Sequence, residues 1–228
     1  MKLNKEPIFN AKLAEIVGIM LGDGCLYLDR LKKYQTAICL HKEEENYMRY
    51  VKKSMEKYFK YKFCITKIKN AYLLRNTSVF VGNQLIKSGL KEGNKVVNKI
   101  IIPSWIFKKK IFLTSVIRGI FDTGGCIYQK YDNFAQIQFK FACFELINSL
   151  HKAIRLLGYN PTKIHIDPDK RGFLKWKFYL SRQKEINLFF ERIRPKNTKH
   201  LKRYYKLKCG DAAIRTRICR CLHQSDAP

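Results

Sequence analysis

The sequence has few acidic residues and no long apolar segment. It contains 18 aspartates and glutamates against 46 lysines and arginines, which gives a formal net charge of +28 at pH 7. A polyanionic partner is the simplest explanation; the alternative, a basic surface that only keeps the protein soluble, fits so large an excess less well. No run of about 18 apolar residues occurs, which argues against membrane binding. The start, Met1-Lys-Leu-Asn-Lys-Glu-Pro7, lacks a secretory signal. We therefore expect an intracellular protein, either cytoplasmic, in the nucleoid, or organellar.

Cysteine is present, but without the setting in which disulfides form. Eight cysteines without a signal segment favour reduced thiols. Five lie in apolar stretches at expected strands or helix starts, where we expect small buried side chains: Cys25, Cys39, Cys64, Cys126 and Cys143. The remaining three, with a histidine, can be drawn as a zinc site, although the spacing matches no familiar ligand pattern: Cys209, Cys219, Cys221 and His223.

One short phrase occurs twice in the chain, at a constant offset of 101 residues. The copies are Ile16-Val-Gly-Ile-Met-Leu-Gly-Asp-Gly-Cys-Leu-Tyr27 and Ile117-Arg-Gly-Ile-Phe-Asp-Thr-Gly-Gly-Cys-Ile-Tyr128. Each is an apolar run of helical length that ends in glycine and passes directly into a strand-like segment. Two such units joined head to tail predict a pseudo-twofold molecule, which suits a twofold or near-palindromic partner.

Small residues recur at every fourth position of both copies. They are Ala14, Gly18 and Gly22 in the first copy, and Ser115, Gly119 and Thr123 in the second. Residues at this spacing share one face of a helix, and small side chains let two helix backbones cross closely. The pattern therefore predicts that the two helices pack against each other and bring Asp23 and Gly124 side by side.

The paired phrases resemble the signature of the LAGLIDADG homing endonucleases in their single-chain, two-motif form. On the nine-letter signature the copies read Ile16-Val-Gly-Ile-Met-Leu-Gly-Asp-Gly24 and Ile117-Arg-Gly-Ile-Phe-Asp-Thr-Gly-Gly125. The segment Ile102-Pro-Ser-Trp-Ile106, followed by a basic run, resembles the linker region of that family. The resemblance covers roughly residues 10 to 205.

The hydrophobic patterns predict the same order of elements, αββαββα, in both halves, and hence an α+β fold. In the first half we expect helices at 11–22, 43–59 and 78–88, and strands at 25–30, 34–40, 62–68 and 71–76. In the second we expect helices at 111–122, 143–157 and 183–192, and strands at 126–130, 134–141, 162–166 and 174–181. The expected divisions are 1–95, 96–205 and a flexible tail at 206–228. The resemblance implies motif helices at the interface, antiparallel sheets that form a DNA-binding saddle, and a monomer.

Two predicted strands of the second half carry polar residues on one face. In the first of these, Gln136, Gln138 and Lys140 alternate with apolar residues; in the second, Lys175, Lys177 and Tyr179 do so. A two-stranded ribbon fits the major groove, where glutamine addresses adenine and lysine addresses guanine or phosphate. The alternative is an ordinary wet sheet face. In the first half only Gln35 and Thr36 are prominent.

The resemblance also implies a chemistry. Hydrolysis of a phosphodiester needs an activated water and stabilised charge on the leaving oxygen, and divalent ions held by carboxylates supply both. The family resemblance assigns catalysis and metal binding to the acid in the eighth place of each motif, Asp23 in the first copy, with the Gly22 carbonyl joining the coordination. Oxygen ligands suit Mg²⁺, for which Mn²⁺ can substitute. The alternative is that Asp23 is an ordinary turn residue that faces water.

The second copy departs from the signature at this place. Its eighth residue is Gly124, which has no side chain. Asp122 lies two residues earlier and points roughly 200° away around the helix axis, so it cannot simply replace the missing acid. For the family's basic residue near the end of each half's last strand, the candidates are Arg75, Arg182 and Lys184.

Two classes of function remain open. One is a site-specific DNA endonuclease, intron- or intein-associated, that is weakened or biased towards one strand. Its partner is double-stranded DNA with a long, near-palindromic or asymmetric site. The other is a catalytically degenerate nucleic-acid-binding protein or an intron RNA maturase on the same scaffold. Asp23 favours the first class, and Gly124 favours the second.

Overall fold

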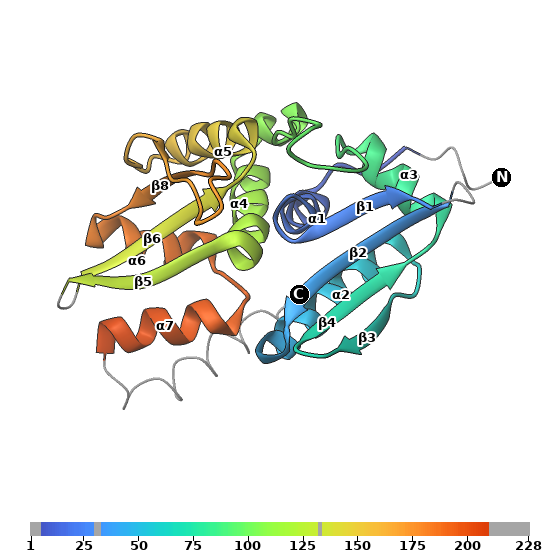
Figure 1. Ribbon diagram of the computed structural model, residues 1–228, viewed down its shortest axis with the longest axis horizontal. Coiled ribbons are helices and arrows are strands. Elements are labelled where there is room, and N and C mark those ends of the chain that lie inside the picture. Colours follow the sequence, from blue (N-terminus) through green and yellow to red (C-terminus); the bar gives the residue numbers. More distant parts are fainter. Residues whose placement is uncertain (1–5, 30–32, 132–133, 210–228) are drawn as a thin grey trace.

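The computed structural model describes residues 6–29, 33–131 and 134–209, which form two similar halves (Figure 1). The N-terminal half contains α1 (Ala11–Gly22), β1 (Gly24–Leu28), β2 (Tyr34–His41), the 3-10 turn η1 (Lys42–Glu44), α2 (Glu45–Phe59), β3 (Cys64–Ile68), β4 (Ala71–Asn76) and α3 (Val79–Lys87). The C-terminal half contains η2 (Ser104–Lys108), α4 (Lys110–Gly124), β5 (Gly125–Tyr131), β6 (Phe134–Phe141), α5 (Phe144–Leu156), β7 (His165–Ile166), β8 (Trp176–Leu180) and α6 (Gln183–Ile193). The predicted order αββαββα is confirmed in both halves.

A further helix, α7 (Thr198–Cys209), follows the second repeat and was not predicted. The predicted boundary at 205 falls inside this helix, so a tail cannot begin before residue 210. Tyr204 explains why the helix continues, because its ring stacks on Phe190 of α6 at a centroid distance of 3.9 Å. Residues 210–228, which include most of the zinc alternative, lie outside the described residues.

Helices α1 and α4 cross in close contact at the centre of the molecule (Figure 1). The small residues make this approach possible, because a Cβ atom on Gly18 would overlap the carbonyl oxygen of Val116, and one on Gly119 would overlap that of Glu15. At the ends of the two helices Gly22 lies against Thr123. The predicted crossing is therefore confirmed. Among the described residues no helix is long and apolar enough to cross a membrane.

Each half contains one four-stranded antiparallel sheet, with strand orders β1-β2-β4-β3 and β5-β6-β8-β7. One face of each sheet packs on helices, because alternate residues such as Ile38 and Phe139 are buried in the core. We call the opposite face of each sheet its open face. Strand β7 has only two residues, but backbone hydrogen bonds from Thr162 and Asp167 to the β8 chain extend the pairing on both sides of it.

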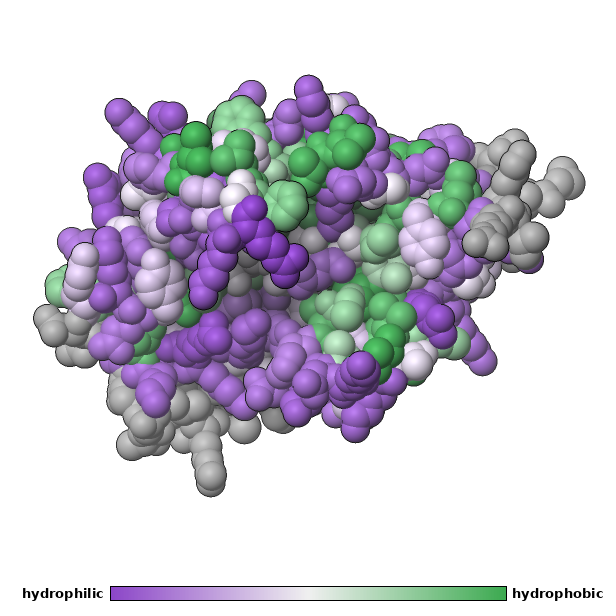
Figure 2. Space-filling model, viewed as in Figure 1, coloured by the Kyte–Doolittle hydropathy of each residue, from purple (hydrophilic) through white to green (hydrophobic). Residues whose placement is uncertain are grey.

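The open faces of the two sheets differ in chemistry. Figure 2 shows hydrophilic residues over much of the C-terminal half and a cluster of hydrophobic residues over the N-terminal sheet. The alternation places three thiols on the N-terminal open face, and all three are exposed: Cys25, Cys39 and Cys64. The expectation that five cysteines are buried is wrong for these three, because they occupy the strand positions that point away from the helices. Cys126 is partly exposed, and only Cys143 among the five is buried.

Candidate active site and nucleic-acid interface

Asp23 caps the C-terminus of α1, where its backbone N–H donates to the carbonyl of Ile19. Its carboxylate keeps contact with solvent, but the surrounding protein desolvates it and raises its pKa to about 6. Lys95 opposes this shift, Glu44 adds to it, and Lys199 opposes it. These three charged groups are therefore the neighbours that act on Asp23.

Lys95 comes from the connection between the halves and reaches the same helix end. Its Nζ donates to the carbonyl of Gly22 over 2.6 Å and to that of Leu21 over 3.1 Å. Burial lowers the pKa of Lys95 to about 8, against the favourable charge of Asp23. A cation at a helix C-terminus offsets the partial negative charge of the unpaired carbonyls. The end of α1 therefore carries a carboxylate and an ammonium together.

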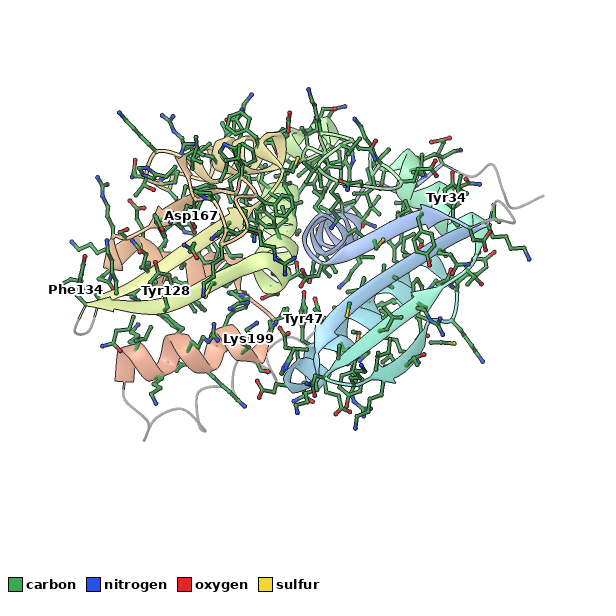
Figure 3. The ribbon with its side chains drawn as sticks, viewed as in Figure 1. Tyr34, Tyr47, Tyr128, Phe134, Asp167 and Lys199 are labelled. Atoms are coloured by element: carbon green, nitrogen blue, oxygen red, sulfur yellow. The ribbon has the colours of Figure 1, made fainter. Side chains whose placement is uncertain are left out.

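Glu44 and Lys199, the other two charged neighbours of Asp23, also contact each other. The Glu44 Oε1 accepts from the side-chain amide of Asn197 over 2.7 Å and lies 3.5 Å from the Lys199 Nζ. Glu44 is buried, so these contacts hold the start of α2 to the segment before α7. Figure 3 labels Lys199 at the end of α7 that faces the N-terminal half.

The equivalent end of α4 carries neither charge. Gly124 is the last residue of the helix, and the ring of Phe141 fills the space that its side chain would enter, 2.6 Å from the position of an added Cβ. Asn197 stands where Lys95 stands in the first half, since its side-chain Nδ2 donates over 2.7 Å to the carbonyl of Asp122, the repeat equivalent of Leu21. Among the described residues, the end of α4 has no counterpart of the Asp23 carboxylate, and a neutral amide meets the carbonyl equivalent to that of Leu21.

Asp122 serves the fold rather than this surface. It is fully buried, and its two carboxylate oxygens accept from the backbone N–H groups of Lys196 and Asn197 at 2.8 and 3.2 Å. Burial raises its pKa to about 7. The expectation that Asp122 cannot replace the missing acid agrees with this position.

The basic candidates chosen from the sequence are not among the charges that act on Asp23. Arg75 lies exposed on the N-terminal open face, opposite Ala37. Arg182 pairs with Glu185 at the start of α6, and Lys184 is exposed on the same helix. Lys95, Lys199 and Glu44 were missed, because each lies in a loop or helix start that carries no motif and becomes a neighbour of Asp23 only through the tertiary fold.

The predicted DNA-binding residues of the second half share the C-terminal open face. Gln136 is 3% exposed, and both ends of its amide are engaged, one by the Tyr128 hydroxyl at 2.7 Å and one by the Ser181 hydroxyl at 2.6 Å. Gln138 donates to the Tyr179 hydroxyl over 3.2 Å. Gln136 therefore supports its neighbours, while no described residue donates a hydrogen bond to the amide oxygen of Gln138.

The lysines of the same face are paired with acids that sequence reasoning missed. Lys140 and Lys177 both contact Asp167, and Lys175 contacts Asp169. In the N-terminal half Gln35 lies on the open face and donates to Asp29 over 3.0 Å. Thr36 is buried, because it occupies the alternate position that faces the helices.

Solved structures of homing endonucleases have a similar fold at low sequence identity. A variant of I-DmoI in complex with its target DNA and manganese has a TM-score of 0.59, with 14% identity over 82% of this chain and 96% of that chain. I-WcaI bound to its DNA recognition sequence also has a TM-score of 0.59, with 13% identity over 87% and 89% of the two chains. The N-terminal LAGLIDADG domain of WhiA has a TM-score of 0.50, with 16% identity over 87% and 91%. No protein-family model and no curated protein matches the sequence.

The chain has the LAGLIDADG homing-endonuclease fold. The two halves, the crossed motif helices and the two antiparallel sheets predicted from the sequence are those of its single-chain, two-motif form. Because identity is below 25%, the likeness concerns the LAGLIDADG fold, and the chemistry must be argued from the residues of this chain.

A divalent ion fits the first half of the site. Asp23 and the Gly22 carbonyl present two oxygens at one helix end, and Mg²⁺ is commonly held by one or two carboxylates together with substrate phosphates and water. The Gly22 carbonyl already accepts from the Lys95 ammonium over 2.6 Å, so a metal ion would use its second lone pair. Within the described residues no group of three or more His, Cys, Asp or Glu side chains is arranged to hold a metal ion, so the remaining ligands would come from DNA and solvent.

Proposed function

We propose that the chain is a site-specific DNA endonuclease that cuts one strand of its target faster than the other. The observation that carries this proposal is the difference between the two helix ends. Asp23 and Lys95 stand together at the end of α1, whereas Gly124 and Asn197 stand at the end of α4. One half of the site therefore has a carboxylate and an ammonium to act on a scissile phosphate, whereas Gly124 and Asn197 supply neither charge to the other.

The roles of the residues follow from their charges. Asp23 and the Gly22 carbonyl would hold a divalent ion, which supplies an activated water and stabilises charge on the leaving oxygen when bound. Lys95 brings an ammonium to the same place, where it stabilises negative charge that develops on the phosphate. Strands β1 and β5 directly follow the ends of α1 and α4, so duplex DNA held on the two open faces crosses these ends, and the charge of +28 draws it there.

Phe141 strengthens the proposal of a silent second half. Because its ring occupies the space beside Gly124, restoring the acid alone would force the ring to move. Gly124 therefore lies between a ring that fills the space beside it and the neutral amide of Asn197 at the same helix end. This surrounding fits a helix end that does not carry an acid.

The test is cleavage of duplexes selected by binding from a library, with Mg²⁺ and with each strand labelled separately. We expect Mg²⁺-dependent cutting that Asp23→Asn reduces by about 10²–10³-fold while binding is retained. The control is Asp169→Asn, which removes the same charge from the C-terminal half and should leave the rate unchanged. Undiminished cutting by Asp23→Asn would contradict the role given to this carboxylate.

A second candidate is a nucleic-acid-binding protein without cleavage, including an RNA maturase. Gly124 and Asn197 favour it, and WhiA shows that LAGLIDADG domains occur in proteins outside the named endonucleases. Specific binding of duplex DNA without cutting under Mg²⁺ or Mn²⁺ would favour a DNA-binding protein. A preference for structured RNA over duplex DNA would favour the maturase.

A further inference from the structure

Two lysines of the C-terminal open face stand directly opposite each other. Lys140 on β6 pairs in register with Lys177 on β8. Like charges in such cross-strand pairs are destabilising. The two lysines nevertheless lie on the two inner strands of the sheet. Their neighbours on this face are the Gln138–Tyr179 pair and the chain that follows β7. This arrangement therefore requires an anion nearby.

Asp167 provides that anion. Its Oδ2 lies 2.5 Å from the Lys140 Nζ, and its Oδ1 lies 2.9 Å from the Lys177 Nζ. Hydrogen bonds from the two ammonium groups lower the pKa of Asp167, and its carboxylate raises the pKa of Lys177. Figure 3 labels Asp167 beside β6 and β8. The three side chains form one ion-paired cluster.

The cluster is partly open to solvent, and its charges determine which group of a bound duplex it can contact. The side chains of Lys140, Asp167 and Lys177 are 33, 29 and 22% exposed. A carboxylate in the centre repels a phosphate, which is unfavourable on a face that binds only the DNA backbone. The same carboxylate is a good partner for a base edge that offers a hydrogen-bond donor.

The major-groove edge of a G·C pair matches this cluster. Guanine presents two acceptors, N7 and O6, which lysine addresses, and cytosine presents the N4 amino donor, which Asp accepts. Resting on the proposed DNA binding, we propose that Asp167, held between Lys140 and Lys177, is a specificity-determining residue that reads one G·C pair. The carboxylate accepts from cytosine N4, and one of the lysines donates to the guanine edge. The simpler alternative is that Asp167 only offsets the repulsion between the lysines.

The experiment is a binding selection from a duplex library with the full chain, followed by sequencing of the bound DNA. Wild-type protein should select a motif in which one position is strongly G·C. Asp167→Asn and Asp167→Ala should select the same motif except at that position, where the preference for G·C falls at least about fivefold. The control is Asp169→Asn, which removes one negative charge from the same loop. The Asp169 carboxylate pairs with Lys175 and accepts from the backbone N–H groups of Arg171 and Phe173.

The outcomes separate this inference from the proposed function. If Asp167→Asn binds all duplexes more tightly but selects an unchanged motif, Asp167 is only a surface anion and the inference is overturned. Loss of preference at the same position in Asp169→Asn would also overturn it, because the effect would then be one of general charge. If wild-type protein selects no motif, both the inference and site-specific binding fail.

Discussion

Lys95 donates a hydrogen bond to the carbonyl oxygen of Gly22 over 2.6 Å, at the helix end that Asp23 caps. Lys95 also donates to the carbonyl of Leu21 over 3.1 Å. In the second half the repeat equivalent of Leu21 is Asp122, and its carbonyl accepts from the neutral side-chain amide of Asn197 over 2.7 Å. This difference makes the pseudo-twofold molecule asymmetric at the two helix ends, where we propose that the scissile phosphates bind.

Replacement of Lys95 tests the importance of this ammonium. Lys95→Met should slow cutting by about 10²–10³-fold, because it removes a positioned charge from the phosphate, while duplex binding changes little. Single-turnover rates and gel-shift affinities measure the two effects. Lys91→Met is the matched control, since Lys91 is exposed in the same connection and donates to the Asn98 carbonyl. Cutting by Lys95→Met at the wild-type rate would contradict the role.

The helix crossing predicts a stability effect. Gly18→Ala and Gly119→Ala should each lower the free energy of unfolding by about 1–3 kcal/mol, because the new methyl group meets backbone atoms of the other helix that cannot move independently. Urea denaturation measures the change. Lys57→Ala, at an exposed position of α2, should be close to neutral. Unchanged unfolding of both glycine variants would show that the helices do not cross as described.

Asp122 predicts a pH dependence of stability. Its pKa is raised from 3.8 when unfolded to about 7 when folded, so the folded protein retains a proton that the unfolded chain releases. The stabilisation from this group is complete below about pH 4 and is lost as the pH rises through about 7. The difference in unfolding free energy between wild type and Asp122→Asn should therefore shrink from pH 4.5 to 7.5. Parallel pH profiles would contradict the buried, protonated carboxyl.

The three exposed thiols predict that bound DNA protects the N-terminal open face from chemical labelling. Cys25, Cys39 and Cys64 should react with N-ethylmaleimide in the free protein, and Cys143 should not, because it is buried. A selected duplex should protect the three exposed thiols, since they lie on the N-terminal open face. Peptide mass spectrometry resolves each site. Equal labelling with and without bound duplex would show that this face does not contact the DNA.

The repeated phrase explains why so much of the fold was predictable. Gly18 and Gly119 each belong to a row of small residues at every fourth position of a helix, and such rows predict a close helix crossing. The alternation in residues 134–141 predicts which side chains face the helices. These patterns are local, and local patterns can be read from a single sequence. Helix α7 was missed because its apolar face is short and lies in a strongly basic segment.

The candidate site was only partly predictable. Asp23 lies in a motif, so its place was clear, whereas Lys95 is one of many lysines and is separated from Asp23 by 72 positions. Asp167 could not be paired with Lys140 and Lys177 without the register of three strands. The cysteines were misread because an apolar strand was taken as buried on both faces. In each case the deciding information is tertiary.

We propose that the second half of the site is catalytically inactive, and strand-resolved cutting of a supercoiled plasmid that carries the selected site measures this. Wild-type protein should accumulate nicked circles before linear DNA, with all early nicks in one strand. The double variant Gly124→Asp, Phe141→Ala should form linear DNA sooner, because it restores an acid and makes room for it. Equal rates for both strands, with linear DNA formed directly by the wild-type protein, would contradict the account.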